Sequence, residues 1–212
     1  MLNELYVLLV SDTLDIKEYK RLFPFISKEK RGKISCHPFD MSQKLSVYAE
    51  VFTKVKICEI LGIDISRITI EKSKYGKPHL AGYPNFHFNI SHTDNAIAVA
   101  FSDEQIGVDI ERIRTPEFKI AERFFTLREQ TYISSSQDPE QAFYEVWTRK
   151  EAYLKYCGTG ITISLKSFDV YDMGNIQTIC LHVKGRHILS VCFANAMKII
   201  SPTVLLENDV RV

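Results

Sequence analysis

Two carboxylates stand two residues apart in the segment GVDIER, residues 107–112. Asp109 and Glu111 alternate with apolar residues, a pattern typical of a β-strand, whose successive side chains point to opposite faces. We therefore expect both acids on one face, about 6 to 7 Å apart. Such a pair either belongs to the wet side of a half-buried strand or holds a cation between its oxygens. The second interpretation requires a third ligand from elsewhere in the chain.

A third carboxylate, Glu151, lies in a segment that the apolar pattern predicts to be helical, residues 143–155. Trp147, Glu151 and Lys155 follow one another at intervals of four and therefore lie along one stripe of the helix. A purely structural interpretation also exists, because Thr148 with Glu151 matches a capping box and Glu151 with Lys155 is an ordinary surface pair. The apolar pattern already runs upstream of Thr148, which places this residue inside the helix and argues against the cap.

The first half of the chain contains one long predicted helix, residues 42–61, with apolar residues at spacings of three and four and a stop at Gly62. Residues 5–10 are predicted to form a strand. Residues 86–113 contain three runs that are separated by turn residues. They predict a three-stranded meander with both acids of GVDIER in its last strand.

The second half repeats this order, with a helical pattern over residues 120–155 and strands after it. Strands are predicted near residues 167–171, 178–183 and 187–194. A helix followed by antiparallel strands, twice, predicts an α+β protein of two similar, pseudo-symmetric halves, each with a helix packed on a small antiparallel sheet. We place the halves at residues 1–105 and 106–212. Because two halves of one chain can build a site at their junction, we expect a monomer.

The composition is that of an ordinary globular protein. The chain has 212 residues, of which 45% are hydrophobic and 25% charged, enough to bury a substantial core. Its net charge of +1 gives no reason to expect a nucleic-acid partner. The first apolar run is short and lacks a basic leader, and no segment could span a bilayer, so we expect no membrane association. Five scattered cysteines without a CxxC pair favour reduced thiols and a cytoplasmic location.

Two blocks of sequence occur in order along the chain, IGVD at residues 106–109 and WTRKEAYLK at residues 147–155. Shorter segments accompany them: a basic stretch at 26–31, YGKP at 75–78, FNISH at 88–92, and RFF at 123–125 followed by Glu129. Together these segments cover most of residues 25–160 and resemble the 4'-phosphopantetheinyl transferases of the surfactin-synthetase-activating type. The resemblance implies the fold of that family.

The resemblance also implies an activity. Such enzymes move the 4'-phosphopantetheine arm of coenzyme A, their co-substrate, to a serine of an apo acyl or peptidyl carrier protein and release 3',5'-adenosine bisphosphate. A hydroxyl attacks a pyrophosphate in this reaction, so the reactants must be aligned and the developing charge stabilised. By resemblance, Asp109, Glu111 and Glu151 hold Mg²⁺, a hard cation that prefers carboxylate, phosphate and water oxygens. Lys155 is implied to bind the pyrophosphate, and Glu151 to act as the base, directly or through water.

Coenzyme A carries a 3'-phosphate in addition, and phosphates are bound by cations and hydrogen-bond donors. By resemblance, the residues that bind coenzyme A are Lys28, Arg31, Lys44, Lys77, Ser91, His92 and Lys155. Lys44 departs from the pattern, because relatives often carry an arginine there and lysine lacks its bidentate fork. Taken alone, Lys28 and Arg31 are typical of a solvated helix face, and His92 is typical of a structural turn residue.

Several alternatives stay open at this point. Lys150 is either a phosphate contact or a helix-surface charge, and Glu129 either follows the family pattern or completes a capping box with Thr126. By resemblance, residues 113–133 border the docking surface for the carrier protein. Two other functions fit the acids in part: another magnesium-dependent phosphotransferase, or a non-catalytic module that binds coenzyme A or a carrier protein. The chain lacks a Walker loop, and a pure binding module has no need of all three acids and Lys155.

Overall fold

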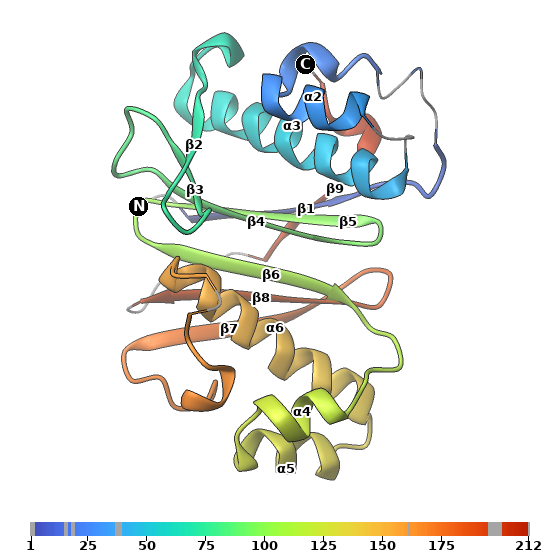
Figure 1. Cartoon of the computed structure of the whole chain (residues 1–212), viewed down its shortest axis with the longest axis vertical. Helices are drawn as coiled ribbons and strands as arrows, with labels where there is room; N and C mark the ends of the chain where they lie inside the picture. Colours follow the sequence, from blue (N-terminus) through green and yellow to red (C-terminus); the bar gives the residue numbers. More distant parts are fainter. Residues whose placement is uncertain are drawn as a thin grey trace.

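Two β-sheets stack on each other in the middle of the molecule, and helices cover their outer faces (Figure 1). The computed structural model describes residues 3–14, 17, 20–36, 40–160, 162–194 and 201–211. The first sheet joins, in spatial order, β4 (His87–Thr93), β5 (Ala96–Ser102), β1 (Asn3–Leu9) and β9 (Thr203–Leu206). The second joins β6 (Ile106–Arg112), β8 (His187–Ala194) and β7 (Ile176–Val183). Apolar side chains of both sheets, such as Val7 and Val108, form one buried cluster between them.

Helix α3 (Met41–Leu61) covers the outer face of the first sheet (Figure 1). Its N-cap is Asp40, whose side chain accepts a hydrogen bond from the Gln43 backbone. The helix ends at Gly62, which has a φ of 64°, a left-handed conformation that glycine adopts without strain. Buried residues of α3 pack with Phe88 and other residues of the sheet. The predicted helix and its stop are confirmed.

Shorter elements flank α3. They are η1 (Phe23–Phe25), α2 (Lys28–Ser35), η2 (Ile65–Arg67), β2 (Ile70–Lys72) and β3 (Pro78–Leu80). Strands β2 and β3 form a separate two-stranded antiparallel sheet, and the YGKP segment leads from their turn into β3.

Helix α6 (Pro139–Cys157) covers the outer face of the second sheet, and α4 (Lys119–Phe124) and α5 (Leu127–Ser135) pack against its first half (Figure 1). Asp138 caps its start, and Gly158 ends it in the left-handed conformation. The predicted α+β class, with a helix on a sheet in each half, is confirmed. Within the described part of the chain, no helix is long and apolar enough to cross a membrane.

Two predicted strand arrangements are wrong. Strands β4 and β5 pair as a hairpin, but β6 does not continue the meander and pairs with β8 in the other sheet. Residues 167–171 form no strand: η3 (Leu165–Ser167) is followed only by a single bridge between Asp169 and Asp172. Alternation defines the two faces of a strand but leaves its partner open, which explains the first error.

The C-terminal segment returns to the first sheet. Strand β9 pairs in parallel with β1, from Tyr6 opposite Thr203 to Leu9 opposite Leu206. It is followed by η4 (Glu207–Asp209). A parallel partner must come from a distant part of the chain, because parallel pairing needs a long crossover. Residues 203–206 therefore lie with the first half in space, although the sequence-based division assigns them to the second.

Gly107 allows α6 to lie directly on β6. A Cβ atom at Gly107 would stand 2.1 Å from the carbonyl oxygen of Ala152 and 2.4 Å from the backbone nitrogen of Tyr156. These are backbone atoms, so a larger residue at position 107 would push the helix away from the strand. Asp109 follows Gly107 on the strand, and Glu151 directly precedes Ala152 on the helix. The same contact therefore holds the segments of both acids together.

Gly107→Ala is expected to lower the free energy of unfolding by about 1 to 3 kcal/mol, because the added methyl group overlaps backbone atoms of α6. Urea denaturation followed by circular dichroism measures the change. Gly32→Ala in α2 is a matched control, since no atom lies within 4 Å of its Cβ position. This control is expected to stabilise the helix by about 0.5 to 1 kcal/mol. A Gly107→Ala protein as stable as the wild type would contradict the packing described.

Candidate active site

Strands β4 and β6 meet at the seam between the two sheets (Figure 1). The Asn89 side-chain oxygen accepts a hydrogen bond from the Val108 backbone nitrogen at 2.9 Å. The Ser91 hydroxyl donates to Asp109 Oδ1 at 2.7 Å. The predicted alternation of residues 86–91 is thus correct: Phe88 faces the core beneath α3, while Asn89 and Ser91 face β6.

Asp109, Ser91 and Lys155 form one hydrogen-bonded group. The Lys155 ammonium lies 2.7 Å from Asp109 Oδ1 and donates to the Ser91 hydroxyl oxygen at 2.7 Å. The other oxygen of Asp109, Oδ2, is buried and has no hydrogen-bond partner among the described residues. Residues from two distant segments of the sequence therefore converge, and one buried carboxylate oxygen still lacks a partner.

The three predicted metal ligands influence one another electrostatically. Burial, followed by the negative charge of Asp109, raises the pKa of Glu111 to about 7. Burial and the Asp109 charge also raise the pKa of Glu151 above its ordinary value. Lys155 opposes both shifts but does not cancel them. Across the described residues, no three His, Cys, Asp or Glu side chains are already arranged as a metal site.

A pocket of about 260 Å³ opens beside Glu151 and Lys155. Its walls come from the YGKP turn, β4 and the end of α6, and they include Lys77, Glu151 and Lys155. The Lys77 ammonium donates to the carbonyl oxygens of Ile106 at 3.1 Å and Tyr156 at 3.0 Å. Burial lowers the pKa of Lys77 to about 8. Lys77 thus ties the YGKP turn to the start of β6 and the end of α6.

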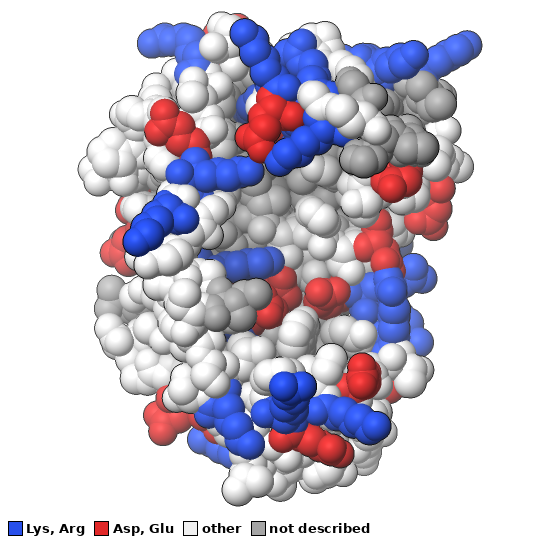
Figure 2. Space-filling model, viewed as in Figure 1, with Lys and Arg blue, Asp and Glu red and all other residues white. Residues whose placement is uncertain are grey.

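A larger groove of about 990 Å³ adjoins the pocket, and Pro78 and Ile90 line both. Its walls come from α2, α3, β2 and β4 and carry Lys30, Lys33, Lys72 and His92. Figure 2 shows Lys and Arg side chains gathered over the upper part of the molecule, where α2 and α3 lie, with acidic side chains at mid-height. Partial burial and the charges of Lys155 and Lys30 lower the pKa of His92.

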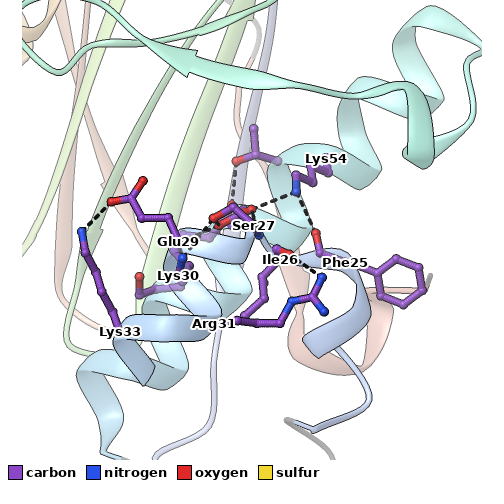
Figure 3. A network of polar contacts seen from close by, with 12 residues as sticks. Phe25, Ile26, Ser27, Glu29, Lys30, Arg31, Lys33 and Lys54 are labelled. Carbon is purple, nitrogen blue, oxygen red and sulfur yellow. Dashed lines mark hydrogen bonds and ion pairs between the residues drawn. The ribbon is translucent and has the colours of Figure 1, made fainter. Parts of the chain in front are cut away.

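Helix α2 is held beside the groove by Glu50 of α3, whose partners Ser27, Lys30 and Lys54 are labelled in Figure 3. Glu50 accepts a hydrogen bond from the Ser27 backbone at 2.6 Å, and Ser27 is the N-cap of α2. Its carboxylate also lies 3.3 Å from the Lys30 ammonium and 2.8 Å from that of Lys54. Lys30 in turn donates to the Ser46 carbonyl oxygen at 2.6 Å. These contacts fix the position of the Lys30 ammonium at the groove wall.

The structure places the predicted basic residues of α2 differently. Lys28 is exposed and does not line the groove, and Arg31 donates to the carbonyl oxygens of Pro24 and Ile26 (Figure 3). Lys30 and Lys33 line the groove instead. Residues three apart share a helix face, so Lys30 and Lys33 form one group and Lys28 and Arg31 another. Helical spacing separates the two groups in the sequence, but only the contacts of α2 with α3 decide that Lys30 and Lys33 face the groove.

Lys44 lies in the protein interior rather than in the groove. Its ammonium donates to the carbonyl oxygens of Ser11 at 2.8 Å and Thr13 at 2.7 Å, and it pairs with Glu207 at 3.0 Å. An ammonium has three donors, and these oxygens occupy them. In this arrangement Lys44 ties α3 to η4 near the C-terminus and does not offer a donor to a phosphate.

Lys150 and Glu129 form a fully buried ion pair, with 2.8 Å between nitrogen and oxygen. Both interpretations of Lys150, as a phosphate contact or as a surface charge, are therefore wrong. The capping box is confirmed, because Glu129 accepts from the Thr126 backbone at 2.8 Å. Its other oxygen accepts from the Val170 backbone at 2.9 Å. Glu129 thus joins the start of α5 to α6 and to the segment after η3.

The region predicted to border a docking surface contains an open hollow of about 520 Å³. Phe118, Leu127 and Pro139 are among its lining residues. Leu127 is 79% exposed and Phe118 is 39% exposed. By contrast, Phe125 is fully buried in the core between α4, α5 and α6. The use of this surface by a carrier protein stays a prediction.

Comparisons with known proteins agree with the motifs. A family model described as "4'-phosphopantetheinyl transferase superfamily" matches residues 105–195, and one described as "4'-phosphopantetheinyl transferase, N-terminal" matches residues 15–104. The 4'-phosphopantetheinyl transferase ffp of Bacillus subtilis is 34% identical over 79% of this chain and 75% of its own length.

Two further relatives show the same likeness. The 4'-phosphopantetheinyl transferase psf-1 of Bacillus pumilus is 35% identical over 72% of this chain and 66% of its own length. The L-aminoadipate-semialdehyde dehydrogenase-phosphopantetheinyl transferase of Mus musculus is 31% identical over 76% of this chain and 59% of its own length. The chain belongs to the 4'-phosphopantetheinyl transferase family. The predicted family and its transferase activity are confirmed.

Lys150→Met is expected to lower the free energy of unfolding by about 3 to 5 kcal/mol, because it leaves the Glu129 carboxylate buried without a cation. Urea denaturation measures the loss. The double variant Glu129→Gln/Lys150→Met is the control: it removes both charges and keeps an oxygen that can accept from the Val170 backbone. It is expected to recover most of the lost stability. A double variant less stable than Lys150→Met alone would show that the pair is not the source of the effect.

Proposed function

We propose that this chain transfers the 4'-phosphopantetheine arm of coenzyme A to a serine hydroxyl of an apo acyl or peptidyl carrier protein. The observation that supports this best is the convergence of Asp109 and Ser91 on Lys155, which lines a pocket that adjoins a larger groove. Coenzyme A is a long molecule with phosphates at two places, and a groove that continues into a pocket suits that shape. Family membership supports the same chemistry.

In this proposal the adenosine end of coenzyme A occupies the groove. Lys30, Lys33 and His92 line it and supply cations and donors for the 3'-phosphate. The pyrophosphate then lies where groove and pocket meet, within reach of Lys155, which lines the pocket with Glu151. Lys77 shapes the same wall through its bonds to Ile106 and Tyr156.

The acids of the seam fit a hard divalent cation, and we assign Asp109, Glu111 and Glu151 to Mg²⁺. All three offer carboxylate oxygens, the donors that Mg²⁺ prefers. Asp109 Oδ2 is buried without a partner among the described residues, and Glu111 and Glu151 repel Asp109. When bound, Mg²⁺ would supply positive charge for the diphosphate and for the charge that develops on the leaving group.

The residues of the chain then have separate tasks. Lys155 binds a diphosphate oxygen and, with Ser91, keeps Asp109 in place. Glu151 accepts the proton of the carrier serine, directly or through one water molecule. The serine oxygen attacks the phosphorus that bears pantetheine, a new P–O bond forms, and the P–O bond to 3',5'-adenosine bisphosphate breaks.

The surroundings of the reaction are also part of the proposal. One chain supplies both β4 and α6 to the site, so a monomer can be active. The five cysteines are free thiols, which supports a reducing, cytoplasmic location. The nearly balanced charge of the chain supports neither nucleic acid nor a membrane surface as a partner.

Incubation of the wild-type protein with coenzyme A, Mg²⁺ and an apo carrier protein is expected to add the mass of the phosphopantetheine arm to the carrier. Mass spectrometry of the carrier measures it. Asp109→Ala is expected to lower the rate about 100-fold or more, because a ligand and the partner of Lys155 are lost together. Circular dichroism serves as the folding control, and chelation of Mg²⁺ is expected to stop the wild-type reaction. Absence of the mass gain with several apo carriers would reject the proposal.

Lys30→Ala is expected to raise the KM for coenzyme A about tenfold, because a charge-assisted hydrogen bond to the 3'-phosphate is lost. The KM for 3'-dephospho-coenzyme A is expected to change little, which separates this effect from general damage to α2. Lys28→Ala is measured beside it, and a larger effect there would favour the sequence-based assignment. Arg67→Ala is the matched control, since Arg67 is exposed in η2 and does not line the groove.

A further inference from the structure

The edge of β4 presents a hydroxyl to each of the two acids of β6. Ser91 donates to Asp109 Oδ1 at 2.7 Å, and Thr93 donates to Glu111 Oε2 at 2.9 Å. Both pairs join residues that are 18 apart in the sequence. At this point β4 and β6 therefore run in the same direction, and each hydroxyl lies beside one acid. The alternation of β4 places both hydroxyls on one face, as the alternation of β6 does for the acids.

Thr93 is the hydrogen-bond donor to the Glu111 carboxylate. Within the described residues, no other hydrogen bond to the Glu111 carboxylate is present. A glutamate side chain has three rotatable bonds, so a half-buried Glu111 without this bond could adopt several orientations. The bond engages Oε2, and no described residue donates a hydrogen bond to Oε1.

The turn after Thr93 is anchored to two arginines that follow Glu111. Asp94 forms an ion pair with Arg112 at 3.6 Å and a shorter one with Arg114. Arg112 directly follows Glu111 on β6. The end of β4 is therefore tied to the end of β6, which keeps the Thr93 hydroxyl within reach of Glu111.

We propose that Thr93 is a positioning residue that sets the orientation of Glu111 for binding of the divalent cation. This inference rests on the assignment of Glu111 to Mg²⁺ in the proposed function. It makes the metal site a joint product of both halves: β6 and α6 supply the ligands, and β4 orients two of them. Groups that hydrogen-bond to metal ligands commonly change metal affinity 10- to 100-fold when they are removed.

Thr93→Val removes the hydroxyl and keeps the shape of the side chain, and Thr93→Ala removes the hydroxyl together with the γ-methyl group. Isothermal titration calorimetry with Mg²⁺, in the presence of coenzyme A and without a carrier protein, measures the dissociation constant. Both variants are expected to raise it about tenfold, whereas Thr93→Ser is expected to stay within about twofold of the wild type. The Mg²⁺ concentration for half-maximal transfer is expected to rise by the same factor, with the KM for coenzyme A unchanged at saturating Mg²⁺.

Thr115→Val is the matched control, because Thr115 donates to Glu140 at 2.9 Å, a hydroxyl–carboxylate bond of the same kind outside the site. It is expected to bind Mg²⁺ as the wild type does. Folded Thr93→Val and Thr93→Ala proteins with wild-type Mg²⁺ affinity would overturn the inference. A Thr93→Ser protein whose Mg²⁺ affinity is as low as that of Thr93→Val would also overturn it. If the wild type transferred the arm without binding Mg²⁺, the inference would fail while the transferase proposal stood. If the wild type transferred nothing, both would fail.

Discussion

The packing of α6 on β6 at Gly107 is the constraint on which the site depends. The strand carries Asp109 and Glu111, the helix carries Glu151 and Lys155, and the two elements meet where position 107 has no side chain. The backbone of Ala152 lies so close that even a methyl group would collide with it. A glycine in this motif thus contributes no chemistry of its own. It sets the distance between the two elements that carry the chemistry.

This close packing places several acids in a poorly solvated seam, where their charges oppose one another. Lys155 compensates Asp109 in part, and the hydroxyls of Ser91 and Thr93 supply further hydrogen bonds. One oxygen of Asp109 nevertheless stays buried without a partner within the described residues. Incomplete compensation of this kind costs stability in the isolated protein and favours the binding of a cation. The seam is therefore better suited to binding than to holding the halves together.

The groove presents its cationic donors in pairs with acidic residues rather than as an excess of positive charge. Lys30 is paired with Glu50, and Lys33 with Glu29 at 2.6 Å. Such pairs weaken the long-range positive potential, in agreement with a net charge of +1 for the chain. The contacts of Lys30 with Glu50 and Ser46 also hold its ammonium group in a defined position, which reduces the conformational entropy lost when a phosphate binds. Selectivity for coenzyme A would then come from the way α2 packs on α3, because this packing sets the positions of the lysine side chains in the groove.

The sequence by itself determined the order of the motifs, the helices over residues 42–61 and 143–155, and the faces of β4 and β6. These features depend on periodicity and capping, which are local properties of the chain. Tertiary structure alone decided which charges are buried. Lys44 meets Glu207, and Lys150 meets Glu129, through contacts between segments that no local pattern relates. It also decided that β6 joins the second sheet and that β9 joins the first, because strand alternation specifies a face but not a neighbour.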